Sequence, residues 1–119
     1  MGQKRSFEVR MLFKPEHVPM ILKGSKIRTR RLWKLCRVKV GNYYKCKTQM
    51  LSKQSFATIQ VTQISKEKLK VSEAKQDCNE DAKKEGYSSW AEFKQKWIQI
   101  NGLWNPEDEP FIIDFEVKL

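Results

Sequence analysis

The run FATIQVTQI, residues 56–64, constrains the fold more than any other part of the chain. Its side chains alternate between two sets, Phe56, Thr58, Gln60 and Thr62 against Ala57, Ile59, Val61 and Gln63. Because successive side chains of a strand point to opposite faces and β-branched residues dominate this run, it predicts a β-strand. A chain of 119 residues is long enough for one compact domain around one core.

Further segments carry β-compatible patterns. The predicted strands are residues 7–13, residues 27–32, two pieces of 37–47 on either side of a turn at Gly41 and Asn42, and residues 111–119. No internal repeat, low-complexity tract or linker is present. Most neighbouring strands are joined by turns, so we expect an α+β domain. Its twisted, mostly antiparallel sheet should curl toward a small barrel flanked by helices.

Three helices are predicted. The first spans residues 15–24, where Pro19 removes one backbone hydrogen bond and should shorten or kink it. The second spans residues 72–85 and ends at Gly86. The third begins at a capping box and carries an apolar stripe at helical spacing, Trp90, Phe93, Trp97 and Ile100. We expect this stripe, and Trp104 after it, to pack in the core rather than bind a base.

The chain carries 24 Lys and Arg against 14 Asp and Glu, a net charge of +10. Such an excess favours polyanions as partners and attracts nucleic acid before any base is read. A small basic protein also gains solubility from the same charge, so charge alone supports either interpretation.

Cysteine usage and hydropathy bear on location. Cys36, Cys46 and Cys78 form no CxxC pair, and with a single His in the chain no zinc-ligand spacing exists, so no metal is expected. An odd, scattered set of cysteines is typical of the reducing cytosol.

The first ten residues lack the apolar region of a signal peptide, and no apolar run is long enough for a membrane helix. We expect a cytoplasmic protein with no membrane partner; the oligomeric state stays open.

Named catalytic motifs are missing from the sequence. It contains no Walker loop, GxSxG elbow, HExxH or dinucleotide-binding glycine pattern, so no cofactor is expected. His17 lies in a predicted helix without an acid or nucleophile nearby, which favours a surface or packing role over a catalytic base.

The segment GSKIRTRR, residues 24–31, concentrates four cations around one threonine. In a strand, Thr29 and Arg31 share one face, whereas Arg28 and Arg30 point to the other. Lys26 reaches the side of Thr29 only if it lies at the junction between loop and strand. The simplest interpretation of this segment is an edge strand protected by charge.

The run FKPEHVPMILKGSKIRTRRLW, with its spacing Gly24-x-Lys26-x-x-x-x-Arg31, resembles the signature of the ASCH domain family of the PUA-like superfamily. FATIQVTQI, EDAKKEGYSSWAEF and WNPEDEPFIIDFE resemble its central strand, helical insertion and closing strand. The resemblance covers residues 11–119 as a single domain and leaves the basic segment 1–10 outside. It implies a small, mostly antiparallel β-barrel with helices around a cleft, a fold shared with RNA-binding domains.

One bacterial branch of this family is an amidohydrolase that removes the acetyl group of N4-acetylcytidine with a Lys, a Thr three residues later and a distant Glu. Those positions match Lys26, Thr29 and Glu85 in this chain, and Arg31 completes the signature. The resemblance thus implies Thr29 as nucleophile, Lys26 as its base and Glu85 as proton donor to the leaving amine. Arg31 is then a candidate contact for a phosphate or the developing oxyanion.

The two other arginines of the segment are further candidates. Arg28 and Arg30 could contact substrate or phosphate, and with Arg31 they could lower the pKa of Lys26 by like-charge repulsion. Without the resemblance, Glu85 reads as a solvated helix carboxylate and Lys26 as a phosphate contact.

Three functions therefore stay open. The first is hydrolysis of an acylated cytidine or a related modified nucleoside. The second is a non-catalytic RNA-binding module, and the third is a ribonuclease whose cations stabilise phosphoryl transfer. In each case the expected partner is RNA or a nucleoside or nucleotide ligand, and the net charge favours a polymer.

Overall fold

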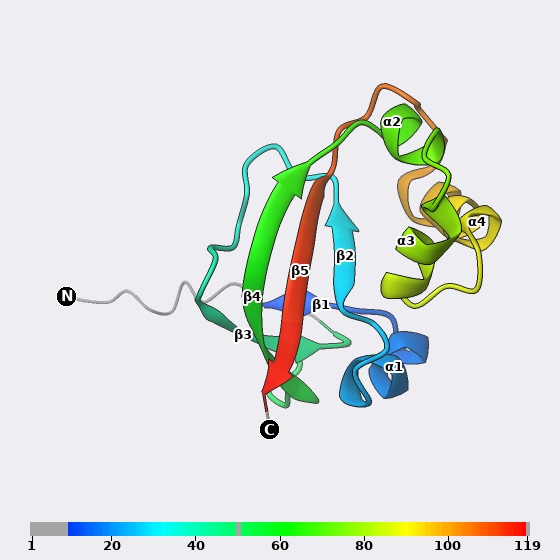
Figure 1. The fold of residues 1–119 in the computed structure, drawn as a ribbon. Helices are drawn as coiled ribbons and strands as arrows, with labels where there is room; N and C mark the ends of the chain where they lie inside the picture. The colour runs from blue at the N-terminus through cyan, green and yellow to red at the C-terminus, as the bar shows by residue number, and fades with distance from the viewer. Residues whose placement is uncertain (1–9, 50, 119) are drawn as a thin grey trace.

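The structure is a computed structural model that describes residues 10–49 and 51–118. Its centre is a five-stranded sheet in the order β1-β3-β4-β5-β2 (Figure 1). The strands are β1 Met11–Leu12, β2 Arg28–Arg31, β3 Tyr43–Lys47, β4 Ala57–Lys66 and β5 Phe111–Lys118. β1 pairs with β3 in parallel, and the other pairs are antiparallel. The predicted α+β class and mostly antiparallel sheet are confirmed.

The sheet curls into a half-barrel. The pairing of β4 with β5 shifts register between Val61 and Gln63, and such a bulge increases local twist. The two outer strands approach each other at one point, where Arg31 of β2 donates a hydrogen bond from Nη2 to the carbonyl of Leu12 in β1 (2.7 Å). The curl toward a barrel that the turn-linked strands predict is therefore present.

Helices flank the sheet (Figure 1). They are the 3-10 turn η2 Pro15–His17 and the α-helices α1 Val18–Leu22, α2 Leu69–Glu73, α3 Cys78–Lys84 and α4 Trp90–Asn101. Pro19 lies in the first turn of α1, where a missing N–H costs little, so the predicted shortening takes the form of a 3-10 turn followed by a five-residue helix. The start of α4 is confirmed, since the Ser89 hydroxyl accepts a hydrogen bond from the Glu92 N–H.

The single helix predicted over residues 72–85 is wrong, because the chain breaks between α2 and α3. Ser72 and Asp81 both bond the guanidinium of Arg30. In one straight helix these two residues would stand roughly 13 Å apart along the axis, too far to share one side chain. The tertiary contacts with a buried arginine therefore override helix propensity.

The strand piece predicted before Gly41 is also wrong. Residues 37–40 form a loop in which Val38 is buried in the core and the Lys39 N–H donates to the Tyr44 hydroxyl (2.8 Å). The Tyr44 hydroxyl thus takes the place of the main-chain carbonyl that a neighbouring strand would offer. Of the strand predicted over residues 7–13, only Met11–Leu12 is extended and paired, and residues 7–9 lie outside the described residues.

Two apolar clusters support the fold. One lies within the sheet, and its fully buried members are Met11, Ile21, Cys46, Ile59, Val61 and Ile113. The other joins the helices through Leu69, Ala82, Trp90, Phe93 and Trp97, with Trp104 packed against it. The core role predicted for the aromatic stripe is confirmed, whereas Ile100 is 57% exposed. No helix among residues 10–49 and 51–118 is long and apolar enough to cross a membrane.

Candidate functional site

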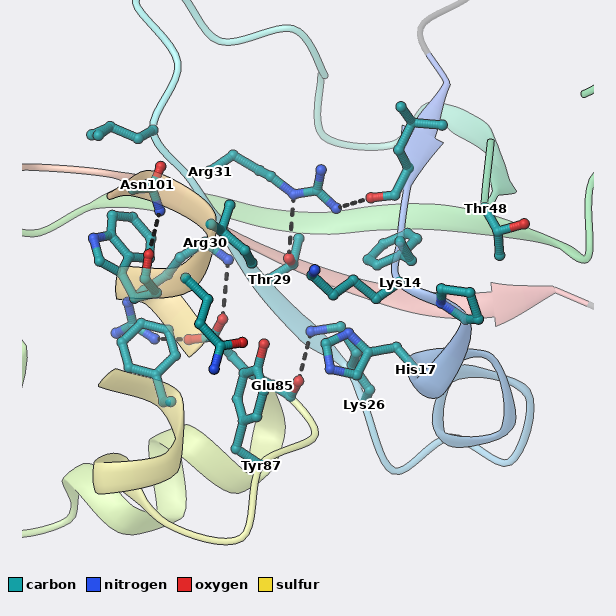
Figure 2. A pocket seen from close by; sticks show the side chains of 18 of the residues that line it. Lys14, His17, Lys26, Thr29, Arg30, Arg31, Thr48, Glu85, Tyr87 and Asn101 are labelled. Carbon is teal, nitrogen blue, oxygen red and sulfur yellow. Dashed lines mark hydrogen bonds and ion pairs between the residues drawn. The ribbon is translucent and has the colours of Figure 1, made fainter. Parts of the chain in front are cut away.

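A cavity of about 700 Å³ opens between β2, the segment that follows β1, the end of α3 and the end of α4 (Figure 2). Its polar lining is Lys14, His17, Lys26, Thr29, Arg30, Arg31, Thr48, Glu85, Gln99 and Asn101. Its aromatic lining is Phe13, Trp33, Tyr87, Phe93 and Trp97. This volume falls within the range of small-molecule sites, and the mixture of aromatic walls with a few polar groups is typical of them.

Lys26 enters this pocket from the loop before β2, the junction that its predicted position requires. Gly24, at φ +80°, turns the chain after α1, and the Lys26 N–H then donates to the Met20 carbonyl. The side chain is 2% exposed. Its ammonium donates to the main-chain carbonyls of Arg28 (2.9 Å) and Glu85 (2.6 Å).

Burial lowers the pKa of Lys26 from its ordinary value to about 8. The Glu85 carboxylate opposes this shift, and the positive charges of Arg31 and Arg30 add to it. Desolvation is therefore the main cause of the lowered pKa of Lys26, whereas the sequence led us to expect like-charge repulsion by the neighbouring arginines. Arg28 is not among the causes. At neutral pH about a tenth of the molecules carry the free amine that a base needs.

Glu85 ends α3 and is 3% exposed, so it is not a solvated helix carboxylate. Its Oε1 accepts a hydrogen bond from the Arg30 N–H (3.2 Å), and its Oε2 forms an ion pair with the Arg30 guanidinium. Burial raises the pKa of Glu85, although Arg30 and Lys26 pull it down. The carboxyl group is therefore oriented by Arg30 within the pocket lining.

Thr29 and Arg31 lie on one face of β2, as alternation predicts. Arg31 donates from Nε to the Thr29 Oγ1 (3.4 Å), and its guanidinium lies 4.9 Å from the centroid of the Phe13 ring. Figure 2 shows both side chains in the pocket. In the described part of the chain Arg31 forms no ion pair with a carboxylate, and burial lowers its pKa.

Arg28 and Arg30 point to the other face, where both reach Asp81. Arg28 also forms an ion pair with Asp114 (2.6 Å) and does not line the pocket. The Arg30 side chain is fully buried beneath it, held by Asp81 and Glu85. These two arginines are neutralised by carboxylates of this chain, so their contact with substrate or phosphate stays a prediction.

The structure brings Lys26, Thr29 and Glu85 to the same pocket, yet it joins them indirectly. Among the hydrogen bonds of residues 10–49 and 51–118, none links these three side chains to one another. Lys26 reaches the main chain of Glu85, Glu85 reaches Arg30, and Thr29 reaches Arg31.

Two further pocket residues, His17 and Lys14, were not expected at a site from the sequence. His17 is buried and packs edge-on against Tyr87 (5.2 Å between centroids), so the packing role is confirmed, yet its ring also lines the pocket. Burial, followed by the charge of Lys26, lowers its pKa to about 4, which keeps the ring neutral. Lys14 points into the pocket from the segment after β1 (Figure 2). The available sequence signal for both residues was their place within the run FKPEHVPMILKGSKIRTRRLW, residues 13–33.

No group of three or more His, Cys, Asp or Glu side chains among the described residues could hold a metal ion. The cations of this pocket suit an anionic or carbonyl-bearing ligand instead.

No protein-family model and no curated protein matches this sequence. Solved structures do resemble the fold. An ASCH domain from Lactobacillus crispatus is similar at a TM-score of 0.59 and 16% identity, with 84% of this chain and 69% of that chain covered. A protein of family DUF984 from Enterococcus faecalis is similar at a TM-score of 0.54 and 17% identity, with 87% and 67% covered. The chain thus has an ASCH-like, PUA-like fold, a curled five-stranded sheet flanked by helices.

Proposed function

We propose that this protein is an ASCH-family enzyme of the amidohydrolase branch, which removes an acyl group from the exocyclic amine of cytidine. N4-acetylcytidine is the reference substrate. One observation carries the proposal: Lys26, Thr29 and Glu85 line a single pocket of about 700 Å³, although they come from a loop, a strand and the end of a helix.

The proposed chemistry begins at Thr29. The neutral amine of Lys26 takes the hydroxyl proton, and Oγ1 attacks the carbonyl carbon of the acetyl group. The C–N bond then breaks, Glu85 gives its proton to the leaving cytosine amine, and an acetyl ester remains on Thr29. Water hydrolyses this ester and releases acetate, while Lys26 and Glu85 return to their starting protonation states. The lowered pKa of Lys26 and the raised pKa of Glu85 both favour these roles.

The walls of the pocket suit a nucleoside. A pyrimidine ring can stack on aromatic side chains such as Trp33 or Tyr87. Arg31, which has no carboxylate partner in the described part of the chain, and Lys14 suit an oxyanion or a 5′-phosphate. The pocket therefore supports a nucleotide unit as well as a free nucleoside.

A second candidate is a binding module that performs no chemistry. The observation that favours it is that both catalytic-type groups are already engaged, the Lys26 ammonium with two main-chain carbonyls and Glu85 with Arg30. In that case the same pocket holds a nucleotide, and Thr29 only contributes a hydrogen bond.

Incubation with N4-acetylcytidine, and separately with short RNAs, followed by chromatography tests these alternatives. Release of cytidine and acetate by the wild type, and at least 100-fold less by Thr29→Ala, would support the enzyme. Thr48→Ala is the matched control, because it also removes a threonine hydroxyl from the pocket lining but keeps the proposed nucleophile, Thr29. Binding without turnover would support the module, and cleaved RNA would support a ribonuclease.

A further inference from the structure

The positive charge of this protein is confined to one part of the chain. Residues 17–66 contain twelve Lys and Arg and no Asp or Glu. Residues 67–119 contain eight Lys and Arg against twelve Asp and Glu. The net charge of +10 therefore does not spread evenly over the surface; it belongs to the strands and loops before α2.

Ion pairing increases this asymmetry. After residue 65, the lysines that form ion pairs with carboxylates are Lys66, Lys68, Lys70, Lys75, Lys83, Lys94, Lys96 and Lys118. Other exposed cations form no such pair within the described residues: Lys14, Lys23 and Lys84, and a second set, Lys34, Arg37, Lys39, Lys45 and Lys53, carried by loop 32–42, β3 and the loop after β3. We call this second set the unpaired basic surface. Its charges repel one another, and a bound polyanion would relieve that repulsion.

The unpaired basic surface is carried by structure that the fold holds in place. Its residues belong to loop 32–42, to β3 and to the loop that follows β3. Loop 32–42 runs on the opposite side of the sheet from α2, α3 and α4 (Figure 1). Val38 anchors loop 32–42 in the core, and the Gly41 N–H donates to the Val61 carbonyl (2.7 Å). The cations around these anchors are thus presented by an ordered backbone.

Two of the segments that carry or adjoin this surface also contribute residues to the pocket. Trp33, at the start of loop 32–42, lines the pocket, and the Arg37 guanidinium lies 5.6 Å from its ring centroid. Thr48, directly after β3, lines the pocket as well. Tyr43, 58% exposed and two residues before Lys45 on β3, adds an aromatic ring among the cations. Cations interleaved with aromatic rings are what single-stranded nucleic acid requires, because phosphates and base faces alternate along it.

We propose that the unpaired basic surface binds the phosphate backbone of single-stranded RNA and so presents a nucleotide of that strand to the pocket. The presentation step rests on the proposed function, whereas backbone binding does not. Exposed Leu35 and Leu51 would also suit an anionic membrane surface. A membrane, however, would not explain why the segments that carry these cations also line the pocket.

The test uses fluorescence anisotropy of a labelled single-stranded RNA across about 50–200 mM salt. The variant Lys34→Ala/Lys39→Ala/Lys45→Ala removes three unpaired cations and spares Arg37, which contacts Trp33. We expect it to lower the slope of log affinity against log salt by about two, and affinity near 100 mM salt by about 100-fold. Tyr43→Ala should weaken binding about ten-fold without changing the slope, because it removes stacking and no charge.

The matched control is Lys75→Ala/Lys83→Ala/Lys96→Ala, which removes the same charge from paired lysines and should keep the wild-type slope. An equal loss in both triple variants would overturn the proposal, as would an unchanged slope in the first, or binding to phosphatidylserine vesicles but not to RNA. Lys34→Gln/Lys39→Gln/Lys45→Gln repeats the test should the alanine variant fail to fold.

Hydrolysis of free N4-acetylcytidine by the same preparations separates this proposal from the proposed function. The first triple variant should keep wild-type rates on the free nucleoside, because none of its three positions lines the pocket. If no preparation hydrolyses the nucleoside but the RNA results hold, the proposed function fails and the RNA-binding surface stands.

Discussion

The ammonium of Lys26 donates a hydrogen bond to the main-chain carbonyl of Glu85 at 2.6 Å, while the Glu85 carboxylate turns to Arg30. The loop before β2 and β2 itself are thus joined to the end of α3 by two contacts of different chemistry. Lys26 is a buried amine with a lowered pKa, and Arg30 is a buried structural cation. Substitutions at these positions should separate effects on chemistry from effects on stability.

The pH dependence of hydrolysis should report the protonation state of Lys26. Its pKa of about 8 predicts that kcat/KM for N4-acetylcytidine rises with pH toward about 8, because only the free amine accepts the Thr29 proton, and falls where Glu85 loses the proton that it donates. His17, with a pKa of about 4, is neutral throughout this range, so His17→Gln should keep the midpoint. A rising limb that persists in Lys26→Met would contradict the role of Lys26.

The same group should leave a signature in stability. Its pKa in the folded protein, about 8, lies below its ordinary value of 10.5. Between these values the unfolded chain binds a proton that the native state does not, so the unfolding free energy rises with pH. Relative to Lys26→Met, wild-type stability should rise by about 3 kcal/mol at most across this window. Urea unfolding of both proteins measures the difference, and parallel pH profiles would show that Lys26 titrates normally in the native state.

Arg30→Met should destabilise the fold strongly. The substitution leaves Glu85 buried without its cation, which typically costs about 3–5 kcal/mol. Lys83→Met is the control, because it breaks an exposed pair with Glu80 that is worth less than about 1 kcal/mol. Urea denaturation compares the two, and similar midpoints would show that the Arg30 network contributes little.

Gly86→Ala should destabilise the protein more than Gly102→Ala does. Both glycines have positive φ, +94° and +92°, so both substitutions carry a backbone cost of about 1–2 kcal/mol. A Cβ on Gly86 would in addition lie 2.9 Å from the Met20 sulfur, whereas one on Gly102 meets nothing within 4 Å. Thermal unfolding should therefore give a lower Tm for Gly86→Ala than for Gly102→Ala. Equal decreases in Tm would mean that the Met20 side chain moves aside at little cost.

Local patterns predicted the parts of the fold that depend on local physics. The strand predicted over 56–64 and the capping box before α4 are confirmed, because each reflects the geometry of one element. The predicted alternation holds only as far as Val61, since the bulge before Gln63 exposes Gln63 and packs Ile64 against the core. The split of Arg28 and Arg30 from Thr29 and Arg31 is confirmed for the same reason. The break between α2 and α3 was missed because the buried Arg30 guanidinium that bonds Ser72 is distant in sequence. The loop before Gly41 was missed because burial of Val38 in the core and a side-chain hydroxyl, that of Tyr44, replace strand pairing there.

The amino-acid sequence by itself determined the strand-rich α+β class, the two faces of β2 and the excess of cations, since these follow from side-chain order along short segments. Only the tertiary structure decided that Lys26, Thr29 and Glu85 share a pocket, that burial lowers the pKa of Lys26, and that Arg28 and Arg30 are neutralised by carboxylates from α3 and β5. The physical reason is that burial and Coulomb interactions depend on distances between residues far apart in the chain, which no local pattern encodes.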